Sequence, residues 1–487
     1  MTRTFAFALA LLIVSVSAPL RAITMEGYLA RVRATHPLFD RERMERDIAE
    51  RHSTRYLGAQ DWSLETGAAL RHVEPLQVTP FDPERIDNVL VDAGGARAFW
   101  GTGSRLSVGW RFDATDQNLP GFVIPGPGGG IEVPVGPSTY YRNMLSATWS
   151  LPLLRNRGGA LDRLAYELSG YDIDLSEVTA IERQEDFVLD VALRFVRWAL
   201  LDEQRRIAAD RLALAEEELG RTRRQRAARL VDEADVLRAQ SAVHLTQAVL
   251  RNIEAAWESA RAELAVLASS EEALAEGPDF DLYEIPAEIP GAAEMEGALV
   301  RSRLVRAIDI QRRQLSRLET GNVEVARPDL ALNLSGALLG GDEAMGSSFA
   351  LDHPDIGVGL ELRYPIGNRT AEADLATTRL ELRQLAYARG EVEVTLRAGM
   401  EGVVTQLEGL DEVLGLDVQR IETARRKTDE EQLLYERGRG NLTFVIQSRD
   451  DEAIARLDYA QNAARYHELV LQYRALADEL LSDAEAR

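Results

Sequence analysis

The sequence of 487 residues contains no cysteine. Disulfide bridges, thiolate metal sites and a lipid-modified N-terminal cysteine are therefore excluded. Histidine is scarce too, and none of the six has the spacing of a metal motif such as HExxH. The histidines are His36, His52, His72, His244, His353 and His467. Because no Ser-His-Asp order or glycine-rich phosphate loop stands out either, we predict neither an enzyme nor a bound cofactor or metal.

Basic residues are fewer than acidic residues in this sequence. The chain has 56 Lys and Arg residues against 79 Asp and Glu, which gives a formal net charge of -23. A protein that binds nucleic acid needs a basic stripe to neutralise phosphates, and the sequence has none. The acidic residues are dispersed, as they are on an ordinary solvated surface. We therefore predict no nucleic-acid partner.

Long hydrophobic runs are missing except at the N-terminus. There Arg3 precedes an apolar run over residues 5–16, and small residues lead up to Ala22. This order is typical of a secretory signal peptide, which we predict to be residues 1–22. Since no later window holds 18 consecutive apolar residues, we expect an exported chain that is either soluble or a β-barrel.

Instead of such runs the chain has short segments in which apolar and polar residues alternate. Residues 145–151 and 357–364 place apolar side chains on one side and small or polar ones on the other, and residues 61–72 and 103–113 do the same. This alternation is typical of a membrane β-barrel strand, but the face of a soluble sandwich would show it too. The Pro- and Gly-rich residues 119–137 fit neither a helix nor a central strand, and we predict an exposed loop there.

The order of landmarks repeats along the chain. Two alternating segments are each followed by a proline and then an Asn-Arg pair. These residues are Pro152, Asn156 and Arg157 in the first half and Pro365, Asn368 and Arg369 in the second. Residues 229–240 also align with residues 438–449. We predict two structural repeats joined by a linker at 276–292, which is rich in Pro and acid. The first is 23–275, with strands within about 61–152 and long helices within about 158–270; the second is 293–487, with strands within about 328–365 and long helices within about 370–483.

Two helical patterns are longer than an ordinary globular helix. Apolar residues step by three and four from Leu161 through Val178 to Ala199, and again from Ile446 to Leu471. Sustained seams of this kind are typical of coiled coils. A helix of about 60 residues would reach about 90 Å at 1.5 Å per residue. Packing between long helices accounts for these seams without a cofactor.

A signal peptide, two repeats and strands that lead into very long paired helices resemble the TolC-type outer membrane factors, also called outer membrane efflux proteins. Residues 23–39 are similar to that family's first helix, residues 150–167 to its strand-to-helix junction and residues 435–473 to its last helical hairpin. The resemblance spans essentially the whole mature chain.

The resemblance implies a mixed, mainly α fold. Long coiled-coil helical hairpins would form a periplasmic α-barrel, and three protomers would each give four strands to one 12-stranded transmembrane β-barrel. Such a homotrimer sits in the outer membrane, in contact with its lipid, and extends into the periplasm. It is a passive exit duct, which receives substrates from an inner-membrane pump through a periplasmic adaptor.

The same resemblance assigns roles at the end of the strand 357–364. The apolar side would face lipid, while Glu361 and Arg363 would face a wet lumen. Pro365 lacks an N–H group and would end strand pairing where the chain leaves the sheet. Asn368 and Thr370 are candidates to cap the helix that follows.

The strand count departs from the family pattern. Two strands are expected in each half, whereas the first half has three alternating segments, near residues 61–72, 103–113 and 141–152. Because an even number is required, we expect the middle segment to belong to an enlarged outer loop.

The resemblance also implies a narrow periplasmic tip at the ends of the helical hairpins. Glycine and asparagine there supply the positive φ that a tight turn needs. The predicted tip and pore-constriction residues are Asp232, Asp235, Tyr435, Gly438, Gly440, Asn441, Phe444, Gln447, Asp450 and Asp451. Phe444 and Gln447 stand where the family often carries acids, and Arg229 stands where it often has glycine. For Asp450 and Asp451 a solvated helix face is an equally good interpretation.

Two other functions stay open at this point. A type I protein-secretion duct has the same fold, and the partner pump would decide between that cargo and small molecules. An exported coiled-coil structural or adaptor protein would also explain the long helices, but it would lack lipid-facing strands.

Overall fold

The computed structural model describes residues 22–76, 78–79, 82–119, 122–124, 126–133, 139–286 and 288–483. The predicted signal peptide lies outside these residues, apart from Ala22. The helices are α1 (Met25–Thr35), α2 (Pro37–Leu57), α3 (Leu164–Ala227), α4 (Glu233–Leu267), α5 (Ala292–Arg301), α6 (Arg303–Val325), α7 (Arg369–Glu436) and α8 (Leu442–Leu476). The strands are β1 (Ser63–Val73), β2 (Arg85–Phe99), β3 (Ser104–Asn118), β4 (Phe122–Ile124), β5 (Ile131–Val133), β6 (Thr139–Pro152), β7 (Asp329–Asp342) and β8 (His353–Arg363).

The chain divides into two compact units, and each takes segments from both predicted repeats. The helical unit comprises residues up to 45, 177–306 and 390–487. The sheet unit comprises residues 46–176 and 307–389. Within the described part of the chain, no helix combines the length and apolar composition needed to cross a bilayer.

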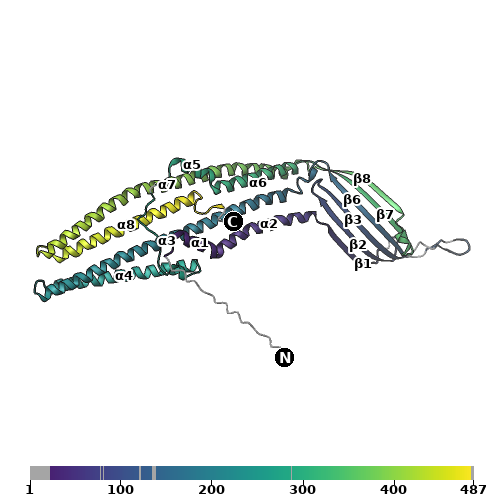
Figure 1. Ribbon diagram of the computed structural model, residues 1–487. Coiled ribbons are helices and arrows are strands. Elements are labelled where there is room, and N and C mark those ends of the chain that lie inside the picture. The colour runs from purple at the N-terminus through teal and green to yellow at the C-terminus, as the bar shows by residue number, and fades with distance from the viewer. Residues whose placement is uncertain are drawn as a thin grey trace, which may run out of the picture. The chain divides into compact units, whose positions relative to one another are not determined.

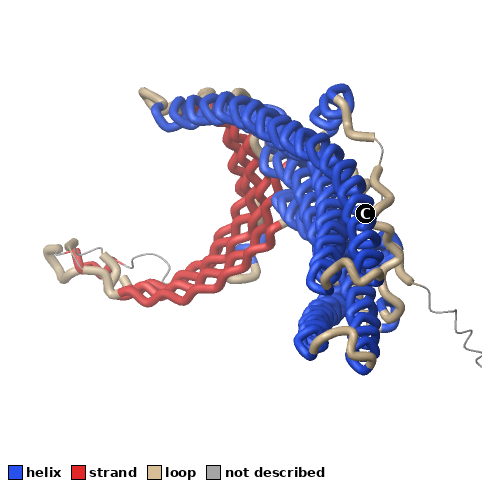
Figure 2. Tube along the Cα trace, turned by 90° about the vertical axis from the view of Figure 1, so that its left-hand side faces the viewer, coloured by secondary structure: helices blue, strands red, loops and turns tan. Residues whose placement is uncertain are grey.

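The sheet unit contains one six-stranded antiparallel sheet, in the order β1-β2-β3-β6-β7-β8 (Figure 1). Its strands lie side by side in a single curved layer (Figure 2). Spatial order follows chain order throughout, although the long helices α3 and α4 intervene between β6 and β7. The short strands β4 and β5 pair with each other, within the stretch predicted to be an exposed loop.

The predicted number of four strands per protomer is wrong, because the sheet has six. The segment at 103–113 is not part of a loop: it is β3, and it pairs along its length with both β2 and β6. The strand that the sequence analysis did not recognise is β2, and with it the sheet has an even number of strands. Its alternation is obscured in the sequence, because Leu90 falls on the polar side and Gly94 and Gly95 supply no side chain to either face.

The register sorts the strand residues into an apolar and a polar face. On the apolar face, Leu70 of β1 is opposite Val89 of β2, and in another row Trp110 of β3 is opposite Leu145 of β6. Side chains on the other face include Glu65, Asp92, Arg111, Arg142, Asn333, Glu361 and Arg363. This confirms the alternation read from the sequence, since successive residues of a strand point to opposite faces.

One end of the apolar face is covered by the β7–β8 connection. That connection forms a short 3-10 helix, Ser347–Ala350, whose Phe349 ring stacks on Phe112 with centroids 6.3 Å apart. Asn143 is fully buried beneath it and donates from its side-chain amide to Ser348 Oγ at 2.8 Å. The indole N–H of Trp110 donates to Asn143 Oδ1 at 3.1 Å. Both polar atoms of this side chain on an apolar face thus have a hydrogen-bond partner.

The helical unit has its core along the predicted seams. Val178, Phe195 and Ala199 of α3 are buried, and so are alanines of α8. The buried alanines are Ala453, Ala455, Ala460, Ala463 and Ala464. Small residues let the helices approach closely, and the prediction of very long, paired helices is confirmed, since α3 has 64 residues and α7 has 68. Figure 1 shows α4 beside α3 and α8 beside α7.

The segment predicted to be a linker packs against the helices. Leu282 is buried in the core of the helical unit, and the Tyr283 ring stacks on Tyr459 with centroids 4.8 Å apart. His467, which interrupts the seam of α8, contacts the Leu282 carbonyl through Nε2 at 3.1 Å. A carbonyl only accepts, so Nε2 carries the proton of the neutral ring. Burial lowers the pKa of His467, which is consistent with a neutral ring that anchors this segment.

Candidate functional site at the ends of the helical hairpins

The connections α3–α4 and α7–α8 have the same backbone geometry, 209 positions apart. Arg229 and Gly438 both have positive φ, 58° and 70°. The N–H of Leu230 donates to the Gln225 carbonyl at 2.9 Å, and the N–H of Arg439 donates to the Leu434 carbonyl at 2.9 Å. The turn therefore forms with arginine at the left-handed position as well as with glycine.

Gly440 is required by close packing rather than by its φ. A Cβ atom at this position would lie 2.8 Å from the backbone nitrogen of Tyr435 and 3.1 Å from the carbonyl carbon of Leu434. Asn441 follows and begins α8, because its Oδ1 accepts from the N–H of Thr443 at 2.9 Å. The predicted turn residues of the second hairpin thus form one tight, capped connection.

The equivalent helix start in the first hairpin uses acids. Asp232 precedes α4, and its N–H donates to Asp235 Oδ2 at 3.4 Å. Asp235 also accepts from Arg238 at 2.7 Å. Carboxylates are favourable at a helix N-terminus, where the free N–H groups and the helix dipole carry positive charge. Both acids therefore have a local structural task at the start of this helix.

Of the remaining predicted tip residues, some are exposed and some are paired. Phe444 and Gln447 on α8 are exposed. Asp450 forms an ion pair with Arg211 of α3. Asp451 forms one with Lys427 of α7, at 2.9 Å. Asp450 thus pairs with a helix of the other hairpin and Asp451 with a helix of its own hairpin. The two acids therefore point to different sides of α8.

Further contacts hold the two hairpins together near their ends. Arg221 of α3 pairs with Glu436 of α7 at 2.9 Å, and the Tyr435 hydroxyl donates to Gln225 Oε1 at 2.8 Å. An apolar cluster lies between them; it comprises Leu219, Ala239, Val243 and Leu442. Sequence reasoning missed Arg211 and Arg221, because an arginine on an amphipathic helix looks the same whether it meets solvent or another hairpin.

A cleft of about 730 Å³ lies between the two hairpins close to these contacts. Apolar residues such as Leu214 and Ile446 line it together with many charged ones. The charged lining residues are Asp210, Arg211, Glu218, Arg238, Arg425, Asp429, Arg449, Asp450, Glu452 and Arg456. Both signs of charge are present, so the cleft suits a partner surface with mixed charge and apolar side chains.

The two strand-to-helix junctions lie in the sheet unit, and the Asn of each pair has positive φ. After β6 ends at Pro152, Asn156 has a φ of 62° and its Oδ1 accepts from the N–H groups of Leu161 and Asp162, at 2.9 and 3.2 Å. After β8 and Pro365, Asn368 has a φ of 36° and its amide donates to the Ala326 carbonyl at 3.0 Å.

The Asn-Arg pairs thus act as corners between sheet and helix. Asparagine tolerates this left-handed conformation better than most residues do. Arg157 lies within a 3-10 turn with an exposed side chain, and Arg369 is the first residue of α7.

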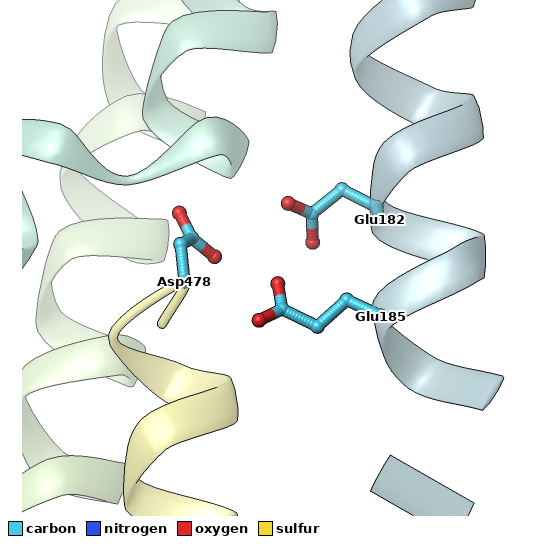
Figure 3. Close-up of side chains that lie close together, drawn as sticks. All are labelled: Glu182, Glu185 and Asp478. Atoms are coloured by element: carbon cyan, nitrogen blue, oxygen red, sulfur yellow. The ribbon is translucent and has the colours of Figure 1, made fainter. Parts of the chain in front are cut away.

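A buried charge cluster, not predicted from the sequence, lies elsewhere in the helical unit. Glu182 and Glu185 on α3 face Asp478, which follows the end of α8 (Figure 3). Their carboxylate oxygens lie within 4.8 Å of one another, close enough to hold a cation. The cation among them is the guanidinium of Arg303: it bonds to Glu182 at 2.9 Å and to Glu185, and lies 3.6 Å from Asp478. We therefore interpret the cluster as structural.

Burial shifts the titration of this cluster. It raises the pKa of Glu182 to about 7, and it also raises the pKa values of Glu185 and Asp478. A carboxyl whose pKa is raised by folding stabilises the fold below its ordinary pKa, and this contribution is lost as the pH rises through the folded value. The cluster should therefore stabilise the helical unit more at pH 5 than at pH 8.

We expect Glu182→Gln to flatten this pH dependence. The variant keeps an oxygen that accepts from Arg303 but never carries a charge, so wild type should lose up to about 3 kcal/mol more than the variant between pH 5 and pH 8. Thermal unfolding of the purified protein across this pH range measures the difference. Glu216→Gln, an exposed position on the same helix, is the control. Parallel pH profiles for wild type and Glu182→Gln would contradict the assignment.

No protein-family model matches the chain, and no curated protein matches its sequence. Solved structures do match. The outer membrane protein VceC from Vibrio cholerae is 12% identical with a TM-score of 0.64, over 93% of this chain and 96% of that one. CusC, whose structures concern transmembrane channel formation, is 10% identical with a TM-score of 0.66, over 94% and 92% of the two chains. The Campylobacter jejuni CmeC outer membrane channel is 10% identical with a TM-score of 0.63, over 95% and 87%. The chain therefore has, over nearly its whole length, the fold of these outer-membrane channel proteins.

Proposed function

We propose that the protein is a passive exit duct in the outer membrane, assembled from three copies and extending into the periplasm. An inner-membrane pump would supply its substrates through a periplasmic adaptor. The observation that carries this proposal is the sheet: six strands in one layer have a mainly apolar face and a mainly polar face. Such a sheet suits lipid on one side and water on the other.

The exposure of the apolar face favours this function over an adaptor or another coiled-coil protein. Leu64, Val358, Leu360 and Leu362 are all strongly exposed on that face. Single exposed apolar residues are ordinary, but a continuous apolar face marks a surface that is covered in the cell. In the proposed duct, lipid covers it. The similar solved structures are described as channels, which agrees with a protein that transports and does not catalyse.

The ends of the helical hairpins would form the periplasmic entrance. Phe444 and Gln447 are exposed near the start of α8 and are the proposed constriction residues. Asp450 and Asp451 would instead hold the hairpins in place, through Arg211 and Lys427. The mixed cleft between the hairpins is the proposed seat of the adaptor. A passive duct of this kind needs neither a cofactor nor an energy source in this chain.

We expect the double variant Arg211→Ala, Arg221→Ala to open this entrance. It removes two ion pairs between the hairpins, each worth about 0.5–1 kcal/mol at a partly exposed site. A change of 1–2 kcal/mol shifts a closed-to-open equilibrium by roughly tenfold. Ion conductance of the purified protein in planar bilayers measures the effect, with Arg251→Ala as control, since that exposed arginine pairs within its own helix.

Two outcomes would count against the proposal. Channels with the same conductance in the double variant and in wild type would contradict the closing role of these ion pairs. Protein that forms neither trimers nor channels in outer-membrane lipid would contradict the duct itself.

A further inference from the structure

The hairpin β2–β3 is built into the sheet rather than laid over it. β2 pairs with β1 from Ser63–Ala96 to Val73–Ile86, and β3 pairs with β6 from Arg105–Ser150 to Asp116–Thr139. The register has no break across these four strands. If this hairpin were removed, β1 and β6 would still run antiparallel to each other. A four-stranded, fully antiparallel sheet is therefore possible without it.

The turn of this hairpin is anchored to the strand-to-helix junction. Trp100 is 6% exposed, and its ring lies 5.8 Å from that of Tyr166. Arg163 donates to the Trp100 carbonyl at 2.8 Å, and the N–H of Gly158 donates to the Thr102 carbonyl at 3.2 Å. A turn with so many specific partners has a fixed place in the fold.

The hairpin extends both faces of the sheet. On its apolar side are Val89 and Val91 of β2, opposite Ala114 and Phe112 of β3. On its polar side Asn88 donates to Asp113 at 2.5 Å and to Thr115 at 2.9 Å. β3 therefore has the two-sided character of a barrel wall, with lipid on one side and water on the other, and β2 joins it to β1 without a break in pairing.

The sheet ends in two strands whose outer edges lack a partner among the described residues. These are β1 and β8. Leu70 of β1 is 84% exposed and Ile356 of β8 is 82% exposed. In a sheet with an even number of antiparallel strands, the two edge strands run in opposite directions, so β8 of one copy can pair antiparallel with β1 of the next. Such head-to-tail pairing generates a closed ring, which leaves no free edge.

We propose that β8 of one copy pairs with β1 of the next, so that a trimer closes a barrel of eighteen strands, six from each copy. The inference rests on the trimeric duct of the proposed function, and it names a second copy of this chain as the partner of both edges. Barrel diameter grows roughly in proportion to strand number, so this barrel would be about 1.5 times as wide as one of twelve strands.

A barrel of this width holds water instead of filling with side chains, as barrels of 16–18 strands do. Its lining has both signs of charge, with Glu65, Asp92, Arg111 and Arg142 on the polar face. The outer-membrane part would therefore discriminate little by size or charge sign. It would pass bulky hydrophilic cargo, and selection would fall to the entrance at the hairpin ends.

Thiol cross-linking tests this proposal directly, because the chain has no cysteine of its own. On the polar face we would place Ala69→Cys on β1 and, in separate variants, Asp355→Cys, Gly359→Cys or Glu361→Cys on β8. Three positions on β8 allow for the unknown register between copies. A Cβ at Gly359 has open space around it. The matched control keeps the β8 cysteines and moves the other thiol to Ser107 of β3.

The reagent is a short bis-maleimide that spans about 8 Å, applied to the assembled protein in outer membranes. Within one copy, β3 and β8 are three strand spacings apart, about 14 Å, and β1 and β8 are five apart, about 24 Å. Products larger than one chain on a denaturing gel therefore report contacts between copies. Native mass spectrometry of the same samples gives the number of copies independently.

We expect covalent dimers and trimers with Ala69→Cys for at least one β8 position, and at least tenfold less with Ser107→Cys. Cross-linking only with Ser107→Cys would overturn the proposal, because β8 would then close on β3 in a twelve-stranded barrel. Native trimers that cross-link with neither set would overturn the strand pairing but leave the trimeric duct intact. An absence of trimers would overturn the proposed trimeric duct as well.

Discussion

Replacing Arg303 with methionine is expected to lower the free energy of unfolding of the helical unit by about 3–5 kcal/mol. The Arg303 side chain is 4% exposed, and its guanidinium also donates to the Leu481 carbonyl at 3.1 Å. Methionine has a similar volume, so packing changes little, but Glu182, Glu185 and Asp478 lose their shared counter-ion. Buried carboxylates without a partner must take up protons or draw in water, and both alternatives are costly.

The matched control is Arg306→Met, one helical turn further along α6. Arg306 also pairs with an acid, Asp483 at 3.2 Å, but its side chain is 50% exposed. We expect this control to cost less than 1 kcal/mol, as surface ion pairs do. Denaturant unfolding of the purified protein gives both values. The penalty for Arg303→Met should shrink at pH 5, where the three acids are more fully protonated. Equal penalties for the two variants at pH 8 would mean that Arg303 is not the counter-ion of this cluster.

Gly159→Ala is expected to have a similarly large effect on the sheet unit. The φ of Gly159 is 70°, and a Cβ atom there would lie 1.8 Å from the carbonyl oxygen of Trp100. The β2–β3 turn would therefore have to move away from the junction, which breaks the hydrogen bonds that anchor it. We expect a loss of more than about 3 kcal/mol, or failure to assemble, because backbone atoms on both sides cannot yield.

The control for Gly159→Ala is its neighbour. Gly158 has nearly the same φ, 69°, but a Cβ there would meet nothing within 4 Å. Gly158→Ala should therefore cost only the strain of a left-handed alanine, about 1–2 kcal/mol. Heat stability of the assembled protein on denaturing gels and protease resistance of the sheet give the readout. Equal losses of stability in the two variants would mean that the β2–β3 turn does not pack closely against Gly159.

Those features that depend on a simple period could be predicted from the sequence. The long helices follow from sustained apolar seams, and β1, β6 and β8 follow from regular alternation. The segment of β3 alternates too, but the expected count of four strands led to the wrong prediction of a loop there. β2 does not, because a leucine lies on its polar side and two adjacent glycines interrupt the pattern. Its place in the sheet is set by its neighbours: the side chain of Asp92 occupies the space above Gly67, and that of Trp62 lies beside Gly95. Tertiary context of this kind leaves no local signal.

In the candidate site, too, some residues could be predicted from the sequence and others could not. The turn residues Gly438 and Asn441 could be predicted, since their backbone requirement is local. The partners of Asp450 and Asp451 could not be, because Arg211 and Lys427 lie on other helices and ion pairing across hairpins depends on how they pack. Arg303 was equally hidden: a basic residue at the first position of a helix gives no sign that three acids from distant segments surround it.

The buried Asn143 has a consequence for how deep the proposed duct sits in its membrane. A buried amide that donates to Ser348 of the β7–β8 connection, beside the rings of Trp110 and Phe112, suits the level of the lipid headgroups, where aromatic rings gather. Trp149, nearer the other end of the same strand, is exposed and suits the opposite level. From Asn143 to Trp149 the strand rises about 20 Å, or about 15 Å along the membrane normal at a tilt of about 40°. The sheet would thus fit a thin hydrocarbon layer, with the β7–β8 connection packed on the sheet at the level of the outer headgroups.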